Sequence, residues 1–284
     1  MKDTYINILK ELPPFKNISS QSIEYLSESS EIINYEIGRP ISSGTIISNK
    51  VFFILSGQAR LLIKTNKEPS TVGKLAKGSI VGLASLLRAS PCEEVNASSE
   101  VKVLSISDKA IIRLYRSDKE FKNWCDKQIQ PAEVLEISEN IISNCAFGDL
   151  SIQSVFAGLL KEIKIETFEK EIIINQSNEF KYFISSANIE GLDINKPIQL
   201  PKNIKCQAPF AGRLIKVPLS FIHSIENTKN ITNQNNSVIE KDIKQGDILP
   251  QPTKENIGKY DTYKSLKIIT AQGELEETIA CMQM

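Results

Sequence analysis

The chain has 284 residues, a length that allows one large domain or two modest ones. Apolar residues make up 41% and charged residues 24%, which is ordinary for a globular protein in water and argues against global disorder. Basic and acidic residues number 34 each, so the net charge is zero and nonspecific binding to nucleic acid or anionic lipid is not expected. Because the sequence has no run of 18 apolar residues and no secretion signal at its start, we expect a cytoplasmic chain without membrane insertion of its own.

The cysteines and the single histidine give little support for a metal site, a disulfide framework or a catalytic site. Five cysteines lie far apart without a CxxC pair, which favours reduced cytosolic thiols over a disulfide framework or a structural zinc site. His223 lies between apolar neighbours, where a packed or surface histidine is more common than a general base. We therefore expect no metal, no cofactor and no enzymatic activity. The cysteines are Cys92, Cys125, Cys145, Cys206 and Cys281.

The periodicity of the first half changes twice. Apolar residues recur at helix spacing until Pro13 and Pro14 end the run, and a second helix follows with Ser19 or Ser20 as its N-cap. Residues 31–107 then form short apolar runs between turn residues, which predicts an antiparallel β-roll or barrel. The longer period after residue 107 predicts short helices and one longer helix ending near Asn144. The predicted fold class is mainly β with flanking helices.

A second cycle of the same pattern follows. VFFILSG at 51–57 aligns with KYFISS at 181–186, a shift of about 130, and residues 95–111 align with 205–222 at a shift of about 111. The difference indicates that the second copy lacks roughly twenty residues, where the first copy has the hairpin RLLIKTNKEPSTVGKL. Tandem rolls with a shortened second copy explain this pattern, and the alternative is chance similarity between short apolar strings.

These observations predict four segments. Residues 1–146 form the first roll with its helices, and residues 147–226 form the second, shortened roll. Residues 227–262 are rich in Asn, Gln, Lys and Pro and are typical of a linker. Residues 263–284 begin a further domain, because a chain rarely stops within an apolar helical turn. We therefore expect a longer polypeptide.

The first roll resembles the cyclic-nucleotide-binding domain over about residues 12–140. The resemblance is carried by PPFKNIS, EIGRPISSG, VFFILSGQARLL, KGSIVGLASLLRASP and EVKVLSISDKAIIRL, with glycines at tight turns. It implies an eight-stranded β-roll with helices at both ends. In this family a Gly-Glu-Leu/Ala turn opens a short helix whose N–H groups meet the ligand phosphate. The glutamate accepts a hydrogen bond from the ribose hydroxyl, and an arginine neutralises the anion. The turn glycines are Gly38, Gly44, Gly57 and Gly82.

The residues that bind the ribose hydroxyl and the phosphate of the ligand in this family are changed in this chain. Leu83 fills the glutamate position, and Cys92, followed by Glu93 and Glu94, stands at the arginine position. Each lost charge-assisted hydrogen bond costs about 1.5–3 kcal/mol, so affinity falls by at least two or three orders of magnitude. Cyclic nucleotide is therefore not expected as a ligand.

Two interpretations of this segment remain open. As a binding site it has only weak candidates, with Arg88 as the one nearby cation, although Arg88 lies on the wrong side of the short helix in the family register. As a packed turn and helix it would place Leu83, Leu86 and Leu87 in the core. The second copy has Gly191-Leu192-Asp193 and no arginine before Arg213. The candidate ligand-binding residues are Gly82, Leu83, Ala84, Ser85, Arg88 and Ser90.

The last residues, QGELEETIACMQM, resemble the opening of the cysteine-peptidase domain of bacteriocin and type I secretion exporters. Gln272 matches the oxyanion-hole glutamine, and Ala280-Cys281-Met282 matches the segment that trails the nucleophile. The nucleophile position itself falls at Glu276 or Glu277, and a carboxylate cannot replace the thiolate there. The resemblance implies an inactive, substrate-docking domain. The alternative is an amphipathic helix with Leu275, Ile279 and Met282 on one face.

The order of these segments, with rolls followed by a polar linker and a peptidase-like start, resembles the N-terminal region of bacterial, particularly cyanobacterial, ABC exporters used in secretion. The leading interpretation is a non-catalytic regulatory or docking region, whose partners are the other domains of the exporter or its peptide cargo. One alternative is a free-standing cyclic-nucleotide or small-anion sensor. Another is a catabolite-activator-type transcription regulator, although no basic recognition helix stands out. A cysteine peptidase is least supported, because neither Cys281 nor His223 has the expected partners.

Overall fold

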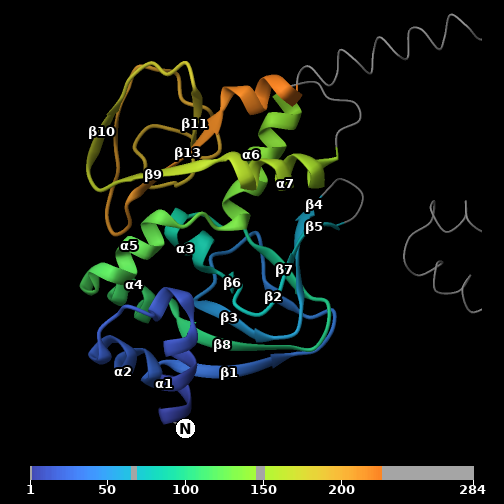
Figure 1. Cartoon of the computed structure of the whole chain (residues 1–284), viewed down its shortest axis with the longest axis vertical. Helices are drawn as coiled ribbons and strands as arrows, with labels where there is room; N and C mark the ends of the chain where they lie inside the picture. Colours follow the sequence, from blue (N-terminus) through green and yellow to red (C-terminus); the bar gives the residue numbers. More distant parts are fainter. Residues whose placement is uncertain (1, 65–68, 145–150, 226–284) are drawn as a thin grey trace, which may run out of the picture. The chain divides into compact units, whose positions relative to one another are not determined.

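The computed structural model describes residues 2–64, 69–144 and 151–225, which fall within one compact unit of residues 1–229 (Figure 1). The predicted linker at 227–262 and the predicted domain start at 263–284 lie outside the described residues. Cys145 and Cys281 lie outside them as well. Over the described ranges, no helix combines the length and the apolar character that a membrane span requires.

The N-terminal helices follow the predicted pattern. Helix α1 (Lys2–Glu11) is followed by the 3-10 helix η1 (Pro13–Phe15), so the proline pair ends α1 as expected. Helix α2 (Ser20–Glu28) begins after Ser19, whose hydroxyl accepts a hydrogen bond from the Ser22 N–H at 3.1 Å. Ser19 is therefore the N-cap, which is one of the two predicted candidates.

The first roll contains eight strands in two antiparallel sheets. One sheet has the order β1-β8-β3-β6 and the other has the order β2-β7-β4-β5. The short helix α3 (Leu83–Arg88) lies between β6 and β7 in the sequence. The strands are β1 (Ser30–Tyr35), β2 (Pro40–Ser42), β3 (Lys50–Ser56), β4 (Ala59–Lys64), β5 (Pro69–Leu75), β6 (Ile80–Val81), β7 (Glu94–Ala97) and β8 (Val101–Ser107).

Three helices follow the first roll, as the longer period predicts. The Ser107 and Asp118 side chains cap the first turns of α4 (Asp108–Ser117) and α5 (Lys119–Lys127). Helix α6 (Pro131–Asn144) ends at the residue that the sequence indicates. Together, sheets and flanking helices confirm the predicted fold class.

The second set of elements begins with α7 (Ile152–Glu162). Five strands follow in two antiparallel sheets, with the orders β9-β13-β11 and β10-β12, and residues 219–225 are again helical. The strands are β9 (Lys164–Phe168), β10 (Glu171–Ile174), β11 (Phe180–Ile184), β12 (Lys202–Lys205) and β13 (Gly212–Pro218).

The two strand sets match each other in topology. Strand β8 lies between β1 and β3, and β13 lies in the same way between β9 and β11. Strands β3 and β11 begin at residues 50 and 180, and β8 and β13 begin at residues 101 and 212, which reproduces both predicted shifts. The second set has no counterpart of the β4–β5 hairpin among its described strands. The sequence therefore places the missing segment correctly.

A single glycine shows why the chain takes different routes after β3 and β11. Gly57, which follows β3, has φ +85°, and a Cβ there would lie 2.0 Å from the Glu100 carbonyl oxygen. Only glycine fits this entry to the β4–β5 hairpin. The matching position after β11 is Ala187, whose φ is not positive. The second copy therefore has neither the glycine nor the positive φ of this turn.

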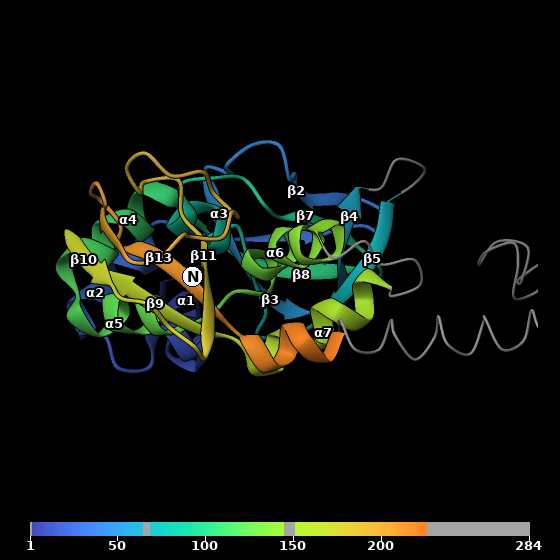
Figure 2. The ribbon, with the colours of Figure 1, turned by 90° about the horizontal axis from the view of Figure 1, so that it is seen from above.

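The two strand sets share one hydrophobic core. One buried cluster contains Ile54 and Val103 of the first roll, Val134 of α6, Phe156 of α7 and Ile215 of β13. Helices α6 and α7 lie next to each other, and α7 packs beside β5 (Figure 2). The division into domains at residues 146 and 147 stays a prediction.

Candidate functional site

Helix α3 begins at a position that requires glycine. Gly82 is its N-cap with φ +90°, and a Cβ at this residue would meet the Lys50 carbonyl oxygen at 2.7 Å. Leu83, Leu86 and Leu87 are buried in the same hydrophobic cluster, as the interpretation of a packed helix predicts, and Ala84 is buried against the roll core. The leucine at the family's glutamate position therefore faces the protein interior.

The carboxylate of Glu93 covers the first turn of α3. One oxygen, Oε1, accepts the Gly82 N–H at 2.8 Å. The other, Oε2, accepts the Ser85 N–H at 2.9 Å and the Ser85 hydroxyl at 2.8 Å. Glu93 is only 4% exposed. Burial raises the pKa of Glu93, while the hydrogen bonds from Ser85 and Gly82 act in the opposite direction. The Gly82 N–H, the Ser85 N–H and the Ser85 hydroxyl therefore all donate to a carboxylate of the same chain.

No positive charge stands at the family's arginine position. Cys92 occupies it, is buried, and lies with its Sγ 3.6 Å from the Ser85 hydroxyl oxygen. Burial raises the pKa of the Cys92 thiol to about 12, so the thiol is neutral near pH 7. Ser90 contributes its N–H to the Ser85 carbonyl at 3.1 Å and closes the end of α3.

Arg88 points out of the first roll. Its guanidinium is fully buried, and Nε donates to the Ser185 carbonyl at 2.6 Å. Nη2 donates to Glu136 of α6 at 3.0 Å and to the Asn195 side chain at 2.6 Å. Nη1 has no hydrogen-bond partner among the described residues. We call residues 82–93 the cassette. The guanidinium of Arg88, at the end of its helix, therefore contacts α6 and the second roll.

A second buried arginine joins the second roll to α5 and α6. Arg213 of β13 forms a bidentate pair with Glu133 of α6, with distances of 2.9 and 2.8 Å, and both residues are at most 1% exposed. Its remaining donors reach the carbonyls of Cys125 at 3.1 Å and Gln128 at 2.8 Å. The Ser185 hydroxyl also donates to Glu133 at 3.0 Å. This pair has the full set of partners that a buried ion pair needs.

Residues 185–187, which we call the connecting segment, meet both arginines. The Ser185 N–H donates to the Arg213 carbonyl at 2.9 Å, and the Arg213 N–H donates to the Ser186 hydroxyl at 2.9 Å. The Ala187 N–H donates to the Arg88 carbonyl at 2.8 Å. Arg88 thus holds this segment with both its side chain and its backbone carbonyl.

Strand pairing places the counterpart of Gly82 away from Gly191-Leu192-Asp193, the segment of the second copy that the sequence comparison set beside it. In the first roll Phe53 pairs with Ile80, two residues before Gly82. In the second roll the matching bridge joins Phe183 to Pro197, which places the counterpart of Gly82 at residue 199. That residue is glutamine, and residues 198–201 are not helical. Short glycine-containing strings misled the alignment, whereas strand pairing fixes the register.

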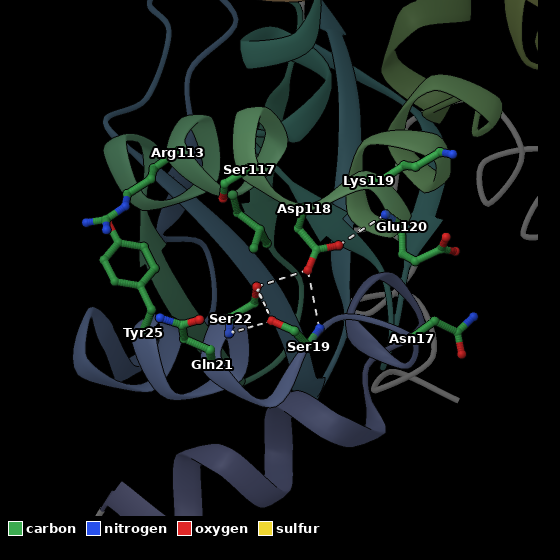
Figure 3. Close-up of a pocket in the computed structure, with 11 residues that line it drawn as sticks. Asn17, Ser19, Gln21, Ser22, Tyr25, Arg113, Ser117, Asp118, Lys119 and Glu120 are labelled. Atoms are coloured by element: carbon green, nitrogen blue, oxygen red, sulfur yellow. Dashed lines mark hydrogen bonds between the residues drawn. The ribbon is translucent and has the colours of Figure 1, made fainter.

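A separate pocket of about 610 Å³ lies between α2 and the α4–α5 junction (Figure 3). At its centre, Asp118 accepts hydrogen bonds from the Ser19 N–H at 3.2 Å and the Ser22 hydroxyl at 2.9 Å. The N–H groups of Glu120 and Phe121 donate to its other oxygen at 3.1 Å each. Although burial opposes them, these four donors lower the pKa of Asp118. The carboxylate therefore joins two helix starts.

The described residues contain no cluster of three His, Cys, Asp or Glu side chains that would hold a metal ion. Cys92 and Cys125 are buried free thiols, and Cys206 is half-buried. His223 is exposed in the helical residues 219–225, so it is the surface histidine of the two predicted possibilities.

With this strand order and cassette helix, the first roll has the architecture of a cyclic-nucleotide-binding domain. Residues 34–118 match the family model described as "Cyclic nucleotide-binding domain". The matched region includes β2 to β8, α3 and Glu93, so the altered cassette lies within it. A comparison with curated protein sequences finds no match.

The chain is also similar to several solved structures, at low sequence identity and with TM-scores below 0.5. A putative cyclic nucleotide-binding protein from Geobacter metallireducens is 18% identical, with 41% of this chain and 86% of that chain covered and a TM-score of 0.37. The regulatory domain of Toxoplasma gondii PKA with cAMP is 11% identical, with 83% and 96% covered and a TM-score of 0.39. The regulatory subunit of a cAMP-independent protein kinase A from Trypanosoma brucei is 13% identical, with 86% and 96% covered and a TM-score of 0.36.

Sequence reasoning missed the roles of Glu93, Arg213 and the connecting segment. A signal for Glu93 was available, because an acid directly after the lost arginine position can reach the cassette N–H groups. A weaker signal marked Glu133, which interrupts an apolar stripe in the helix PAEVLEIS. Its pairing with Arg213, 80 positions away, had no sequence signal.

Proposed function

We propose that this chain is a non-catalytic regulatory or docking region whose cyclic-nucleotide-binding fold no longer takes a cyclic nucleotide. One observation carries the proposal. The Glu93 carboxylate already accepts the N–H groups at the start of α3, which the family resemblance assigns to the ligand phosphate. The anion position is thus filled by the chain itself.

The energetics oppose exchange of Glu93 for a ligand. A phosphate would have to displace three hydrogen bonds to a charged group, each worth about 1.5–3 kcal/mol. It would find a neutral thiol at Cys92 and no free guanidinium, since Arg88 is engaged elsewhere. Leu83 also offers no acceptor to a ribose hydroxyl. Because 1.4 kcal/mol is a factor of about ten, the combined loss exceeds two orders of magnitude in affinity.

Calorimetry of the full chain with cyclic AMP and with cyclic GMP tests this proposal. We expect no saturable heat up to about 1 mM of either ligand, which corresponds to a binding free energy weaker than about 4 kcal/mol. A dissociation constant in the micromolar range would overturn the proposal and support the alternative of a cyclic-nucleotide sensor.

A reconstructed cassette provides a positive control. The double variant Cys92→Arg/Glu93→Ala restores the phosphate cation and removes the internal carboxylate, while the buried Leu83 is left unchanged. We expect it to bind cyclic nucleotide at micromolar concentrations. The single variant Cys92→Arg, which keeps Glu93, is the matched control and should bind at least about tenfold more weakly, by one lost charge-assisted hydrogen bond.

We further propose that the chain is the cytosolic front part of a longer ABC-type exporter, with the exporter's other domains or its peptide cargo as partners. The resemblance of residues 272–284 to a peptidase-domain opening, preceded by rolls and a polar linker, supports this context. These residues lie outside the described part of the chain. Sequencing the genomic reading frame beyond residue 284 tests it. A continuation into six apolar spans and a GxxxxGK[ST] loop is expected, and a stop codon would contradict it.

A further inference from the structure

Helix α4 carries a row of basic side chains on its exposed face. Lys109, Arg113 and Arg116 are all exposed, and their spacing places them on one side of the helix. None of the three forms an ion pair with another residue of the described ranges. The acid beside them, Asp108, accepts the Lys109 backbone N–H at 2.6 Å. The positive charges of this row are therefore available to a partner.

Two hollows follow the same face of α4. The pocket of about 610 Å³ described above and a second pocket of about 350 Å³ share Arg113 and Ser117 in their linings. Helix α2 forms the other wall of the larger pocket (Figure 3). Ile112 is half-buried and gives the smaller pocket an apolar lining. We call the two hollows together the α4 groove.

Arg113 is already oriented where the two hollows meet. Its Cζ lies 4.3 Å from the centre of the Tyr25 ring of α2 (Figure 3). A guanidinium stacked on a ring keeps the N–H groups at its edge free to donate, and these match the two oxygens of a carboxylate. Because the side chain is ordered in advance, less conformational entropy is lost when a partner binds.

We propose that the α4 groove binds an acidic segment of a partner protein, in which carboxylates alternate with apolar residues. The inference rests on the proposed docking role, for which it names the surface and the chemistry of the partner. Lys109 and Arg116 are seven residues apart on the helix, so the basic row is about 10 Å long. A single small anion cannot contact the whole row, whereas a segment with several carboxylates matches it. An apolar side chain between two carboxylates would contact Ile112.

The larger pocket is not basic throughout, and this gives the partner a direction. Asp118 and Glu120 line it beyond the end of α4. The Asp118 carboxylate is engaged by four donors of the chain, whereas the Glu120 side chain is exposed. A bound acidic segment would therefore place its carboxylates along α4 and away from Glu120.

An anionic membrane surface fits the groove less well. A helix that binds a membrane inserts large apolar side chains between the lipids. The exposed large hydrophobic residues among the described ones lie outside α2, α4 and α5. A hollow between two helices also accommodates a peptide chain better than a flat layer of headgroups. These exposed residues are Ile37, Ile46, Ile47, Leu160 and Ile173.

Fluorescence anisotropy with the full chain tests the proposal, and the probe is a labelled peptide in which glutamate and leucine alternate. We expect saturable binding that weakens as the salt concentration rises. The triple variant Lys109→Gln/Arg113→Gln/Arg116→Gln should bind at least about tenfold more weakly, because each exposed charge pair contributes a factor of about two to five. A peptide with lysine in place of glutamate should not bind.

A second triple variant is the matched control. Lys74→Gln/Lys77→Gln/Lys102→Gln removes the same charge from exposed positions of the first roll that do not line the groove. Its affinity for the glutamate peptide should stay within about twofold of wild type, because exposed charges more than a Debye length away are largely screened. Circular dichroism should show that both triple variants are folded.

Tyr25→Leu distinguishes a built site from a general attraction between opposite charges. The substitution leaves the net charge unchanged but removes the ring on which Arg113 stacks. We expect the glutamate peptide to bind about two- to fivefold more weakly, since an exposed cation–π contact is worth about that factor.

Four results would overturn the proposal. They are no saturable binding of the glutamate peptide, equal losses in the two triple variants, an unchanged affinity in Tyr25→Leu, and binding of wild type to phosphatidylserine-containing vesicles in preference to the peptide. The last result would assign the basic row to a membrane surface instead. Calorimetry with cyclic nucleotides does not involve the α4 groove, so failure of the proposed function is distinguishable from failure of this inference.

Discussion

The two rolls keep the same strand order but use the end of the third strand differently. In the first roll, Gly57 turns the chain into the β4–β5 hairpin, and α3 follows later as a cassette helix. In the second roll the hairpin is missing, and the residues after β11 contact α3 and α6 instead. Without a hairpin there, the Ser185 and Ala187 N–H groups pair with the carbonyls of Arg213 and Arg88.

The two rolls also differ in the residues that they contribute to the contacts between them. In the complete copy, the Glu93 carboxylate accepts the N–H groups of Gly82 and Ser85 at the start of α3. The shortened copy contributes the connecting segment and the buried Arg213, which hold it to the complete copy. The ligand position and the inter-roll contacts lie at opposite ends of one helix.

The largest expected effect comes from breaking the attachment of the second roll. Arg213→Met leaves the Glu133 carboxylate buried without its partner, and removing one member of a buried pair costs about 3–5 kcal/mol. Urea unfolding followed by circular dichroism measures the loss of unfolding free energy. We expect a correspondingly lower midpoint.

A double variant serves as its control. Arg213→Met/Glu133→Leu removes both charges, and we expect it to be more stable than Arg213→Met alone, because no charge is left unpaired. Arg116→Met, which alters an exposed arginine on α4, should leave the midpoint nearly unchanged. A double variant as unstable as the single one would contradict the assignment of a charge pair.

A smaller effect is expected at the turn that distinguishes the two rolls. Gly57→Ala gives the first roll the residue of the second, at a φ of +85° and 2.0 Å from a backbone oxygen. We expect a loss of about 2–4 kcal/mol from the backbone conformation and the overpacking together. Thermal unfolding provides the measurement.

Gly38→Ala is the matched control for that substitution. Gly38 has a similar φ of +80°, but an added Cβ meets nothing within 4 Å. It should therefore show only the conformational cost of about 1–2 kcal/mol. Equal losses at the two positions would mean that the close approach to Glu100 does not determine the turn.

The smallest effect is expected where the first roll joins its own helices, away from the second roll. Asp118→Asn keeps an N-cap side chain but removes the negative charge at the starts of α5 and α2, and we expect a loss of about 0.3–1 kcal/mol at pH 7. The folded state lowers the pKa of Asp118, so this stabilisation is present above the ordinary aspartate pKa of about 3.9. It disappears as the pH falls through the lower, folded value.

The pH dependence distinguishes this carboxylate from a merely structural contact. Unfolding curves of wild type and Asp118→Asn should differ by a constant amount well above the ordinary aspartate pKa and converge once the pH falls below the lowered, folded-state pKa of Asp118. A difference that persists in acid would show that the side-chain shape, rather than the negative charge, stabilises the junction.

Local patterns determined much of this fold. The end of α1 at the proline pair, the Ser19 cap, the succession of short strands over residues 31–107 and the end of α6 follow from residues that are adjacent in the sequence. The repeat shifts follow as well, because strand length and turn spacing survive in a copy. The altered cassette was also visible, since Leu83 and Cys92 stand where a glutamate and an arginine are expected.

Only the tertiary structure decided what fills and surrounds the cassette. Glu93 reaches the α3 N–H groups because β7 returns beside the helix start, and the Arg88 side chain points outward because the connecting segment offers it a carbonyl. Arg213 and Glu133 are 80 positions apart. Such contacts depend on how strands and helices pack, and a short-range sequence pattern carries no record of a partner that distant.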